Sequence, residues 1–335
     1  MLGRRSKKRI AIVRDPVYKD SPLDELDVLA QAQGVSEALL SLGYEVKILP
    51  FFLKIVPFRR TLERVKPTCI FNLVETIEGD GRIIHIAPTL FDHLGVPYTG
   101  AKTEAIFFTS HKVLAKKWMN LVNIPTPEWV MRGQGSSGNL PFPAHYIIKP
   151  LWEDASVGID KESVVMASCL EELYSLIAKR EQKIGKVCFA GRYIDGREFN
   201  ISLLANENGV DVLPPAEIRF NFPEGMFKIV DYKAKWDVSS FEYKKTNRSF
   251  NFDKSDNALL EKLKEISRQC WDVFGLKGYV RVDFRVDKEG NPWVLEVNAN
   301  PCINPDSGFV AATAKAGLSY AKAIERIVDD ALARP

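Results

Sequence analysis

Residues 278–298 carry an alternation of side chains that is typical of an antiparallel hairpin. Side chains along a strand point alternately to its two faces. In the segment GYVRVDFRVD, residues 278–287, one face therefore carries valine and phenylalanine and the other carries charge. The turn DKEGN and the segment PWVLEVN follow, so the chain returns as a second, neighbouring strand. The charged residues of the first strand are Arg281, Asp283, Arg285 and Asp287.

The second strand of this hairpin holds Glu296 and Asn298 within an apolar run. Pairing of the two strands brings these side chains to Asp283, with Arg281 alongside. Two carboxylates and an amide carbonyl form an all-oxygen set, which favours Mg²⁺ or Mn²⁺ with phosphates and water completing the shell. The alternative is a solvated face of surface ion pairs. Because an unpaired carboxylate is costly in a buried strand, the four residues together favour the metal.

The first hundred residues predict an α/β unit with a parallel sheet. Short apolar strands are expected at 9–13, 45–51 and 69–75, with an amphipathic helix between the first two. This order is typical of a parallel sheet with crossover helices. No GxGxxG follows the first strand, so a dinucleotide site there has no support.

Composition excludes several classes of protein. A net charge of +3 over 335 residues gives no strong field for nucleic acid or for a membrane surface. The basic start of the chain leads into an apolar run that ends at Arg14, too short for a secretion signal, and no apolar segment is long enough to span a membrane. Five scattered cysteines without a CxxC pair suggest a reducing, cytoplasmic location, and the four histidines form no zinc motif.

The remaining segments alternate between helices, strands and two conspicuous loops. A helical pattern runs from 103 to about 123, strands are expected at 145–150 and twice within 186–206, and helices at 258–275 and 319–332. Residues 132–143 are rich in Gly, Ser and Pro and form a surface loop. Residues 227–252 have weak periodicity and predict a long, functional loop.

A metal held by so few protein ligands implies phosphates, and phosphates need cations. Lys112 near a helix start and Lys149 at a strand end are the candidates, although a lysine is more often an ordinary surface residue. The small-residue loop DASVG, 154–158, offers backbone N–H groups to phosphate oxygens. Glu198 is either an acceptor for a ribose hydroxyl or one half of an exposed pair with Arg197.

These segments together resemble the ATP-grasp ligases, and within them the D-alanine–D-alanine ligases and their relatives. The resemblance covers nearly the whole chain and rests on the order and spacing of its motifs: GVPYTG (95–100), HKVLAKKW (111–118), IIKPLWEDASVGI (147–159), YIDGREFNISLL (193–204), DYKAK (231–235) and the hairpin through NANP (278–301). It implies three α/β units, 1–104, 105–188 and 189–335, with ATP between the central and C-terminal units. It also implies phosphorylation of a carboxylate to an acyl phosphate and attack by an amine. The reactants would be amino acids or short peptides, and a homodimer is expected.

The resemblance assigns a role to individual residues. The ATP contacts it implies are Lys112, Lys149, Ser156, the hinge Arg192, Tyr193 and Ile194, Glu198 for the ribose, and Lys235 for the γ-phosphate. Two magnesium ions would be bound by Asp283, Glu296 and Asn298. Arg281 would stabilise negative charge on the acyl phosphate and the tetrahedral intermediate. Ser307 matches a position that contacts the carboxylate of the second substrate.

This sequence departs from the family pattern mainly around the first substrate. Ala155 and Trp236 stand where the family has a serine and a tyrosine that form a network with an N-terminal glutamate. Glu25 is the nearest candidate for that glutamate, with Asp24 and Asp27 as alternatives, and Glu75 lies in a segment where a histidine is usual. The other departures are Gly191 in place of the hinge glutamate that bonds adenine, Asp154 for a glycine, and Cys302 for the glycine that faces the oxyanion.

The expected function is an ATP-dependent carboxylate–amine ligase whose substrates differ from two D-alanines. A true D-alanine–D-alanine ligase and a non-catalytic ATP-binding module are the alternatives. Cys302 as a nucleophile is disfavoured, because no histidine is near it in sequence.

Overall fold

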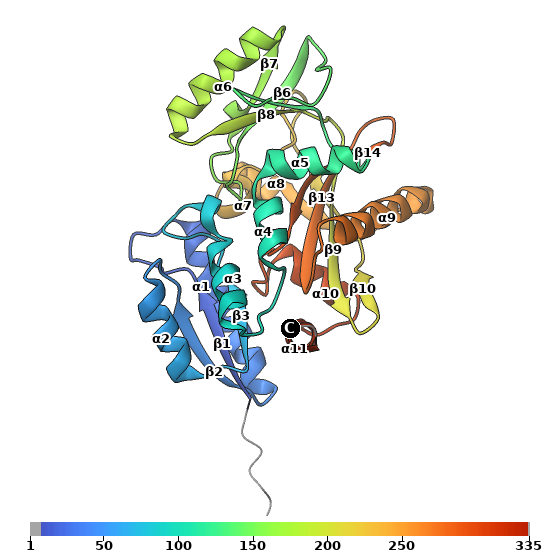
Figure 1. Cartoon of the computed structure of the whole chain (residues 1–335). Coiled ribbons are helices and arrows are strands. Elements are labelled where there is room, and N and C mark those ends of the chain that lie inside the picture. Colours follow the sequence, from blue (N-terminus) through green and yellow to red (C-terminus); the bar gives the residue numbers. More distant parts are fainter. Residues whose placement is uncertain (1–7, 334–335) are drawn as a thin grey trace, which may run out of the picture.

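The computed structural model describes residues 8–333 and contains three separate β-sheets within that range (Figure 1). The basic lead-in at residues 1–7 lies outside the described residues. The three sheets succeed one another along the chain, from the blue unit through the green unit to the orange and red unit of Figure 1. The division at 104/105 and 188/189 stays a prediction, and strand β8, Cys188–Arg192, belongs to the second sheet.

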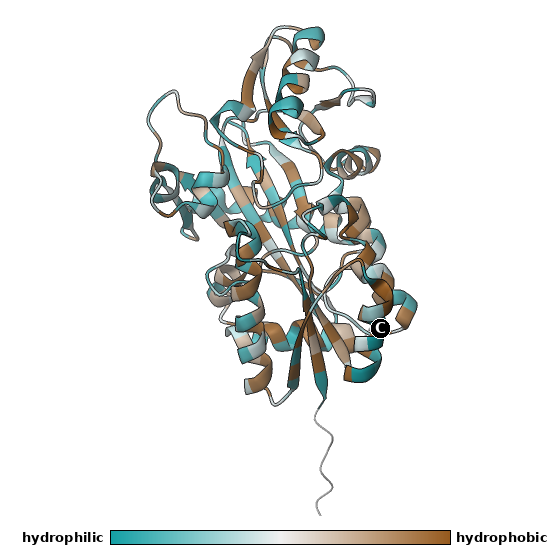
Figure 2. Ribbon diagram, turned by 90° about the vertical axis from the view of Figure 1, so that its left-hand side faces the viewer, coloured by the Kyte–Doolittle hydropathy of each residue, from teal (hydrophilic) through white to brown (hydrophobic). Residues whose placement is uncertain are grey.

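The N-terminal sheet is parallel, as its sequence pattern predicts. Its order is β2-β1-β3, and its strands are β1 (Arg9–Arg14), β2 (Glu45–Pro50) and β3 (Cys69–Leu73). The helices of this unit are α1 (Leu23–Ser41), α2 (Ile55–Val65), the short η1 (Gly81–Ile83) and α3 (Ile86–Leu94). Figure 2 shows its converging strands mainly in brown, as expected for strands covered by helices. The segment GVPYTG adds one parallel bridge to this sheet, between Ile70 and Tyr98.

The second sheet is antiparallel, with the order β5-β4-β8-β6-β7. Its strands are β4 (Trp129–Met131), β5 (Gly135–Ser136), β6 (Ala144–Pro150), β7 (Val164–Ala167) and β8 (Cys188–Arg192), and η2 (Lys161–Ser163) and α6 (Leu170–Ile184) complete it. The helical pattern at 103–123 forms two helices, α4 (Thr103–Ser110) and α5 (Lys112–Leu121). They separate at His111, whose extended backbone breaks the helix and whose Nδ1 accepts from the Leu114 N–H at 3.0 Å.

The third sheet is the largest and contains the predicted hairpin. Its order is β12-β11-β9-β13-β14, with β10 also paired to β9. The strands are β9 (Arg197–Asn206), β10 (Gly209–Val212), β11 (Ala216–Phe220), β12 (Thr246–Ser249), β13 (Tyr279–Val286) and β14 (Pro292–Asn298). Its helices are η3 (Lys254–Asp256), α9 (Asn257–Val273), α10 (Gly308–Lys315) and α11 (Tyr320–Ala333). Helices α4 and α5 pack into the same apolar core as β9 and β13, so this sheet supports the start of the central unit.

At one point the backbones of the N-terminal and C-terminal units lie in direct contact, at Gly100 and Gly278. Gly278 has a left-handed φ of +66°, and a Cβ there would lie 2.8 Å from the Cα of Gly100. Gly278 therefore requires glycine, because a Cβ there would push the two backbones apart, whereas Gly100 favours glycine through its left-handed φ of +84°. The segment GVPYTG thus lies against the start of β13 and orients the N-terminal unit relative to the hairpin.

The prediction of an irregular loop at 227–252 is wrong in part. The segment contains α7 (Tyr232–Trp236), α8 (Phe241–Lys245) and β12, and β12 pairs with β11 at the sheet edge. Asp231 and Ser240 cap the two helices by accepting from the N–H groups of Ala234 and Tyr243. Each helix spans five residues, too few for a hydrophobic period to be visible, which is why the sequence pattern appeared irregular.

Candidate active site

The hairpin brings the three predicted metal-ligand side chains together. Arg281 is opposite Asn298, and Asp283 is opposite Glu296, with a register shift directly after Asp283. The Asn298 Nδ2 donates to Asp283 Oδ2 and to Glu296 Oε1, each at 3.2 Å. Asp283 is 6% exposed and Arg285 is 4% exposed, so the alternative of a solvated charged face is wrong for these residues.

The donor chemistry of this set fits a hard divalent cation. Two carboxylates and an amide lie within hydrogen-bonding distance of one another, and rotation of the Asn298 amide would present its oxygen in place of its N–H. Within residues 8–333, no group of three or more His, Cys, Asp and Glu side chains is placed to hold a metal. A cation at the hairpin would therefore depend on phosphate and water for much of its shell.

Neighbouring cations control the ionisation of the two carboxylates. Burial opposes ionisation of Glu296, but Lys112, Lys149 and Arg281 outweigh it, so the pKa of Glu296 lies below its usual range. Burial dominates at Asp283 and raises its pKa, although Arg281 donates to both carboxylate oxygens at 2.7 Å. In the hairpin, Glu296 is thus firmly ionised, and the charge of Asp283 is balanced by its ion pair with Arg281.

The two predicted phosphate-binding lysines lie at the same carboxylates. Lys112, at the start of α5, is buried, and its Nζ lies 2.6 Å from Asp154 and 3.8 Å from Glu296. Burial lowers the pKa of Lys112, but Asp154 and Glu296 outweigh it and the pKa is raised. Lys149, in β6, has its pKa lowered by burial, with Glu296 opposing that shift. These lysines are therefore not ordinary surface residues.

The small-residue loop at 154–158 is held against α7. Ala155 and Ser156 have left-handed φ values of 54° and 61°. The Ser156 hydroxyl donates to the carbonyl of Val230 at 2.7 Å, and the Trp236 indole N–H donates to the carbonyl of Ala155 at 2.9 Å. Lys235 places its ammonium 5.2 Å from the centre of the Trp236 ring. The segment predicted to close over the phosphates therefore lies against the loop predicted to bind them.

The predicted hinge follows β8. The N–H groups of Arg192 and Tyr193 already donate to the carbonyls of Glu128 and His145. Within the described chain, the N–H of Ile194 makes no hydrogen bond, which leaves it available to a nucleotide base. The Arg192 guanidinium lies 3.0 Å from the Glu128 carboxylate and 5.0 Å from the centre of the Trp293 ring.

Glu198 is buried and pairs with Arg285 at 3.1 Å. The alternative of an exposed pair with Arg197 is wrong, because Arg197 bonds Glu217 and Asp256. Glu198 and Arg285 are opposite each other on β9 and β13, on the face that also carries Asp283.

Side chains of α1 meet the loop after β14 at the predicted first-substrate position. Asp27 contacts the Cys302 thiol at 3.1 Å and accepts from the Asn304 amide at 2.5 Å. Gln31 donates to Glu75 at 2.8 Å, and its oxygen accepts from the Ile303 N–H at 3.1 Å. The N-terminal unit and the loop after β14 are thus joined by one polar network, formed by Asp27, Gln31, Glu75 and residues 302–304.

Burial raises the pKa of Glu75 to about 7, although Gln31 and Lys235 oppose the shift. Burial also raises the pKa of the Cys302 thiol well above its usual value, aided by Glu75 and Asp27. Cys302 is thus protonated at neutral pH, which argues against a nucleophilic role.

Glu25 and Ser307 each form a local hydrogen bond. Glu25 accepts from the Ser21 hydroxyl at 2.8 Å, whereas its neighbour Asp24 accepts from the Tyr232 hydroxyl at 2.8 Å. Of the acids at the start of α1, Asp24 therefore contacts the α7 segment directly. Ser307 caps α10, and its oxygen accepts from the Val310 N–H at 3.3 Å, so its own hydroxyl proton remains available.

Comparison with known proteins gives a family. Residues 124–329 match the family model described as D-ala D-ala ligase C-terminus. The chain belongs to the D-alanine–D-alanine ligase family.

Individual members of this family are similar over most of their length. The uncharacterized protein y4sG of Sinorhizobium fredii is 33% identical over 279 residues, which cover 80% of this chain and 78% of that one. A D-alanine–D-alanine ligase of Synechococcus is 29% identical over 316 residues, covering 91% of this chain and 89% of the relative. The crystal structure of a D-alanine–D-alanine ligase from Bacillus anthracis complexed with ATP has a TM-score of 0.71 at 18% identity, covering 97% of this chain and 98% of that chain.

Family membership confirms the expected class. The protein is an ATP-dependent, ADP-forming carboxylate–amine ligase with the ATP-grasp fold. Within residues 8–333, no helix combines the length and apolarity needed to cross a membrane.

Two residues near the site, Gln31 and Arg248, were not found from the sequence, whereas Asp27 was already an alternative for the N-terminal glutamate. Asp27 and Gln31 are four residues apart and lie on the buried side of α1, where Gln31 is 1% exposed. Polar residues at that spacing beside Val28 and Val35 are a usable signal. Arg248, in β12, had no such signal, because only the sheet pairing shows which face it occupies.

Proposed function

We propose that this ligase keeps the phosphate chemistry of its family and takes a first substrate other than D-alanine. The observation that supports this is the composition of the polar network between α1 and the loop after β14. Asp27, Gln31 and Glu75 meet there, and Glu75 and Cys302 occupy positions where the family resemblance leads one to expect a histidine and a glycine.

Asp283, Glu296 and Asn298 would hold Mg²⁺, whose positive charge offsets the repulsion between triphosphate and carboxylate when it is bound. Lys112 and Lys149 flank these ligands and would bind phosphate oxygens. The shortest ion pair of Lys112 in this structure is with Asp154. When ATP is bound, an oxygen of the γ-phosphate would replace the Asp154 carboxylate as the partner of Lys112.

The reaction is a phosphoryl transfer followed by an acyl transfer. A carboxylate oxygen of the first substrate forms a bond to the γ-phosphorus while the bond to the β-phosphate oxygen breaks, which gives ADP and an acyl phosphate. The amine then adds to the acyl carbon and loses a proton, and inorganic phosphate departs. Lys235 and Arg281 would stabilise the charge that develops in these steps. Contact between α7 and the 154–158 loop would keep water from the acyl phosphate.

The first substrate carries a carboxylate and, in this proposal, a cationic group that meets Glu75 and Asp27. An α-amino acid or a short peptide satisfies both requirements. The ribose would bond Glu198, and the base would bond the Ile194 N–H. D-alanine, named for the Synechococcus relative, remains the alternative first substrate.

The test is a panel of amino acids and dipeptides of both hands, offered singly and in pairs with ATP and Mg²⁺. ADP release and the mass of the product are measured together. Release that requires a pair other than two D-alanines supports the proposal. Release with D-alanine alone, and D-alanyl-D-alanine as product, would replace it by the true D-alanine–D-alanine ligase. A particle mass in solution twice that of the chain would support the expected homodimer.

A further inference from the structure

Arg248 lies on the same sheet face as the ATP-binding residues. It is opposite Ile218 in β11, Ile218 is opposite Glu198 in β9, and Glu198 is opposite Arg285 in β13. Residues that pair directly across a sheet share a face. The side chain of Arg248 therefore lies on the same face of the sheet as Glu198 and Arg285, although β12 is the edge strand.

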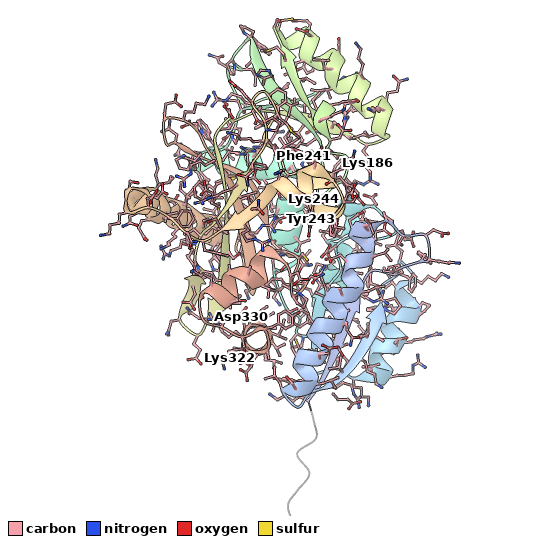
Figure 3. All side chains as sticks on the ribbon, turned by 180° about the vertical axis from the view of Figure 1, so that it is seen from behind. Lys186, Phe241, Tyr243, Lys244, Lys322 and Asp330 are labelled. Atoms are coloured by element: carbon pink, nitrogen blue, oxygen red, sulfur yellow. The ribbon has the colours of Figure 1, made fainter. Side chains whose placement is uncertain are left out.

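The guanidinium of Arg248 reaches the start of α10. A Cβ at Gly308 would lie 3.3 Å from Arg248 Nη2 and 3.6 Å from Cζ, which places the planar group directly over the residue after Ser307. Figure 3 labels Phe241, Tyr243 and Lys244 on α8, the helix that directly precedes the Arg248 strand β12.

Arg248 has no acidic partner among residues 8–333 with which it forms an ion pair. Its pKa is lowered by burial and by the neighbouring Arg281, a second cation. Two guanidinium groups near each other without a shared carboxylate repel one another, unless an anion lies between them. Arg281 is occupied by Asp283 through Nε and one terminal nitrogen, so Arg248 is the freer of the two.

We infer that Arg248 and Ser307 together bind the carboxylate of the amine substrate, which is therefore an amino acid or peptide with a free carboxylate. This rests on the proposed ligase function. Arg248 would then determine the specificity for the amine substrate. The family resemblance assigns only Ser307 to this carboxylate, so Arg248 is an additional contact. Arg281, which is bonded to Asp283, would keep its proposed role of stabilising the tetrahedral intermediate.

The experiment compares amine substrates that differ only in this carboxylate. Each α-amino acid of the panel is offered as the amine with the same first substrate, beside its primary amide. The variants are Arg248→Gln and Arg248→Lys. Arg219→Gln is the matched control, because Arg219 lies one residue along β11 from Ile218, is exposed, and bonds Glu217 and Asn251.

For Arg248→Gln, kcat/KM for the amino acid should fall by about 10- to 100-fold through KM, as expected when a charged hydrogen bond is lost. The same constant for the amide and KM for ATP should stay unchanged, and Arg248→Lys should keep part of the selectivity. Equal loss for acid and amide, or a profile like that of Arg219→Gln, overturns the inference while leaving the ligase function intact. A wild type that releases no ADP with any pair of the panel overturns the proposed function, and the inference with it.

Discussion

The indole nitrogen of Trp236 lies 2.9 Å from the carbonyl oxygen of Ala155. This hydrogen bond joins α7 to the 154–158 loop through a backbone acceptor, so it does not need the serine hydroxyl that Ala155 lacks. At the two positions where the family resemblance places a serine and a tyrosine of the first-substrate network, Ala155 and Trp236 are therefore joined by a different pair of groups.

Trp236→Phe should lower kcat/KM about fivefold, because one neutral hydrogen bond contributes about 1 kcal/mol. The fraction of ATP hydrolysed without product should rise, since the loop would exclude water less well. Trp118→Phe is the control, because the Trp118 indole also donates to a backbone carbonyl, that of Val273, at 3.2 Å. If both variants behave alike, the contact is structural and not part of closure.

Asp154→Asn should lower KM for ATP by about three- to fivefold, a modest change because half of the Asp154 side chain is exposed to solvent. The carboxylate bonds Lys112, and its removal frees that lysine for phosphate. Initial rates at varied ATP measure the effect. Glu162→Gln, on an exposed ion pair with Lys183, should leave KM unchanged. A higher KM for Asp154→Asn would show that Asp154 helps to bind the nucleotide complex.

Glu296→Gln should reduce turnover by about a thousandfold while the fold survives, because the loss of an anionic ligand weakens charge stabilisation by several kcal/mol. The loss should be accompanied by a higher Mg²⁺ requirement, measured as ADP release against Mg²⁺ concentration. Glu289→Gln, in the turn of the same hairpin, is the control. Full activity of Glu296→Gln would exclude the assignment as a metal ligand.

Glu75→Gln should stabilise the protein at about pH 8 by roughly 1–3 kcal/mol. The pKa of Glu75 is raised from 4.5 to about 7 in the folded state, so above pH 7 the fold must hold a buried, ionised carboxylate. That penalty fades as the pH falls from about 7 to 4.5, and the two proteins should become equally stable at the lower limit. Urea unfolding at both ends of this range measures the difference. Glu78→Gln, at an exposed carboxylate of the same turn, should show no such trend.

Cys302 should resist alkylation at neutral pH, because its pKa is raised well above the usual value by burial. The exposed Cys169 should react first with iodoacetamide, as peptide mass mapping would show over time. Cys302→Ala should retain turnover. Rapid labelling of Cys302 with loss of activity would restore the nucleophile hypothesis.

The hairpin and the parallel N-terminal sheet could be predicted because their information is local. Alternation placed Asp283, Glu296 and Asn298 on facing strands, and apolar runs separated by a helix gave β1, β2 and β3. Both depend only on the period of side-chain orientation within a few residues.

The polar network between α1 and the loop after β14 could not be predicted, nor could the position of Arg248, because their contacts join distant segments. Asp27 and Cys302 are 275 residues apart, and their meeting depends on how α1 packs against the loop after β14. The face occupied by Arg248 depends on a register across three other strands. The same limit explains why 227–252 was expected to be irregular, since its two short helices are fixed by caps and by pairing at the sheet edge.

In the proposed function, the network from Asp27 and Gln31 to residues 302–304 would select the acid, and the hairpin with its lysines would bind ATP, so the two tasks would fall on different parts of the chain. None of the residues proposed to bind the nucleotide lies on helix α1. Replacement of α1 and the loop that faces it should therefore change which carboxylic acid the enzyme accepts, while the residues that bind ATP stay the same. A scaffold organised in this way is a practical starting point for making unfamiliar peptide bonds.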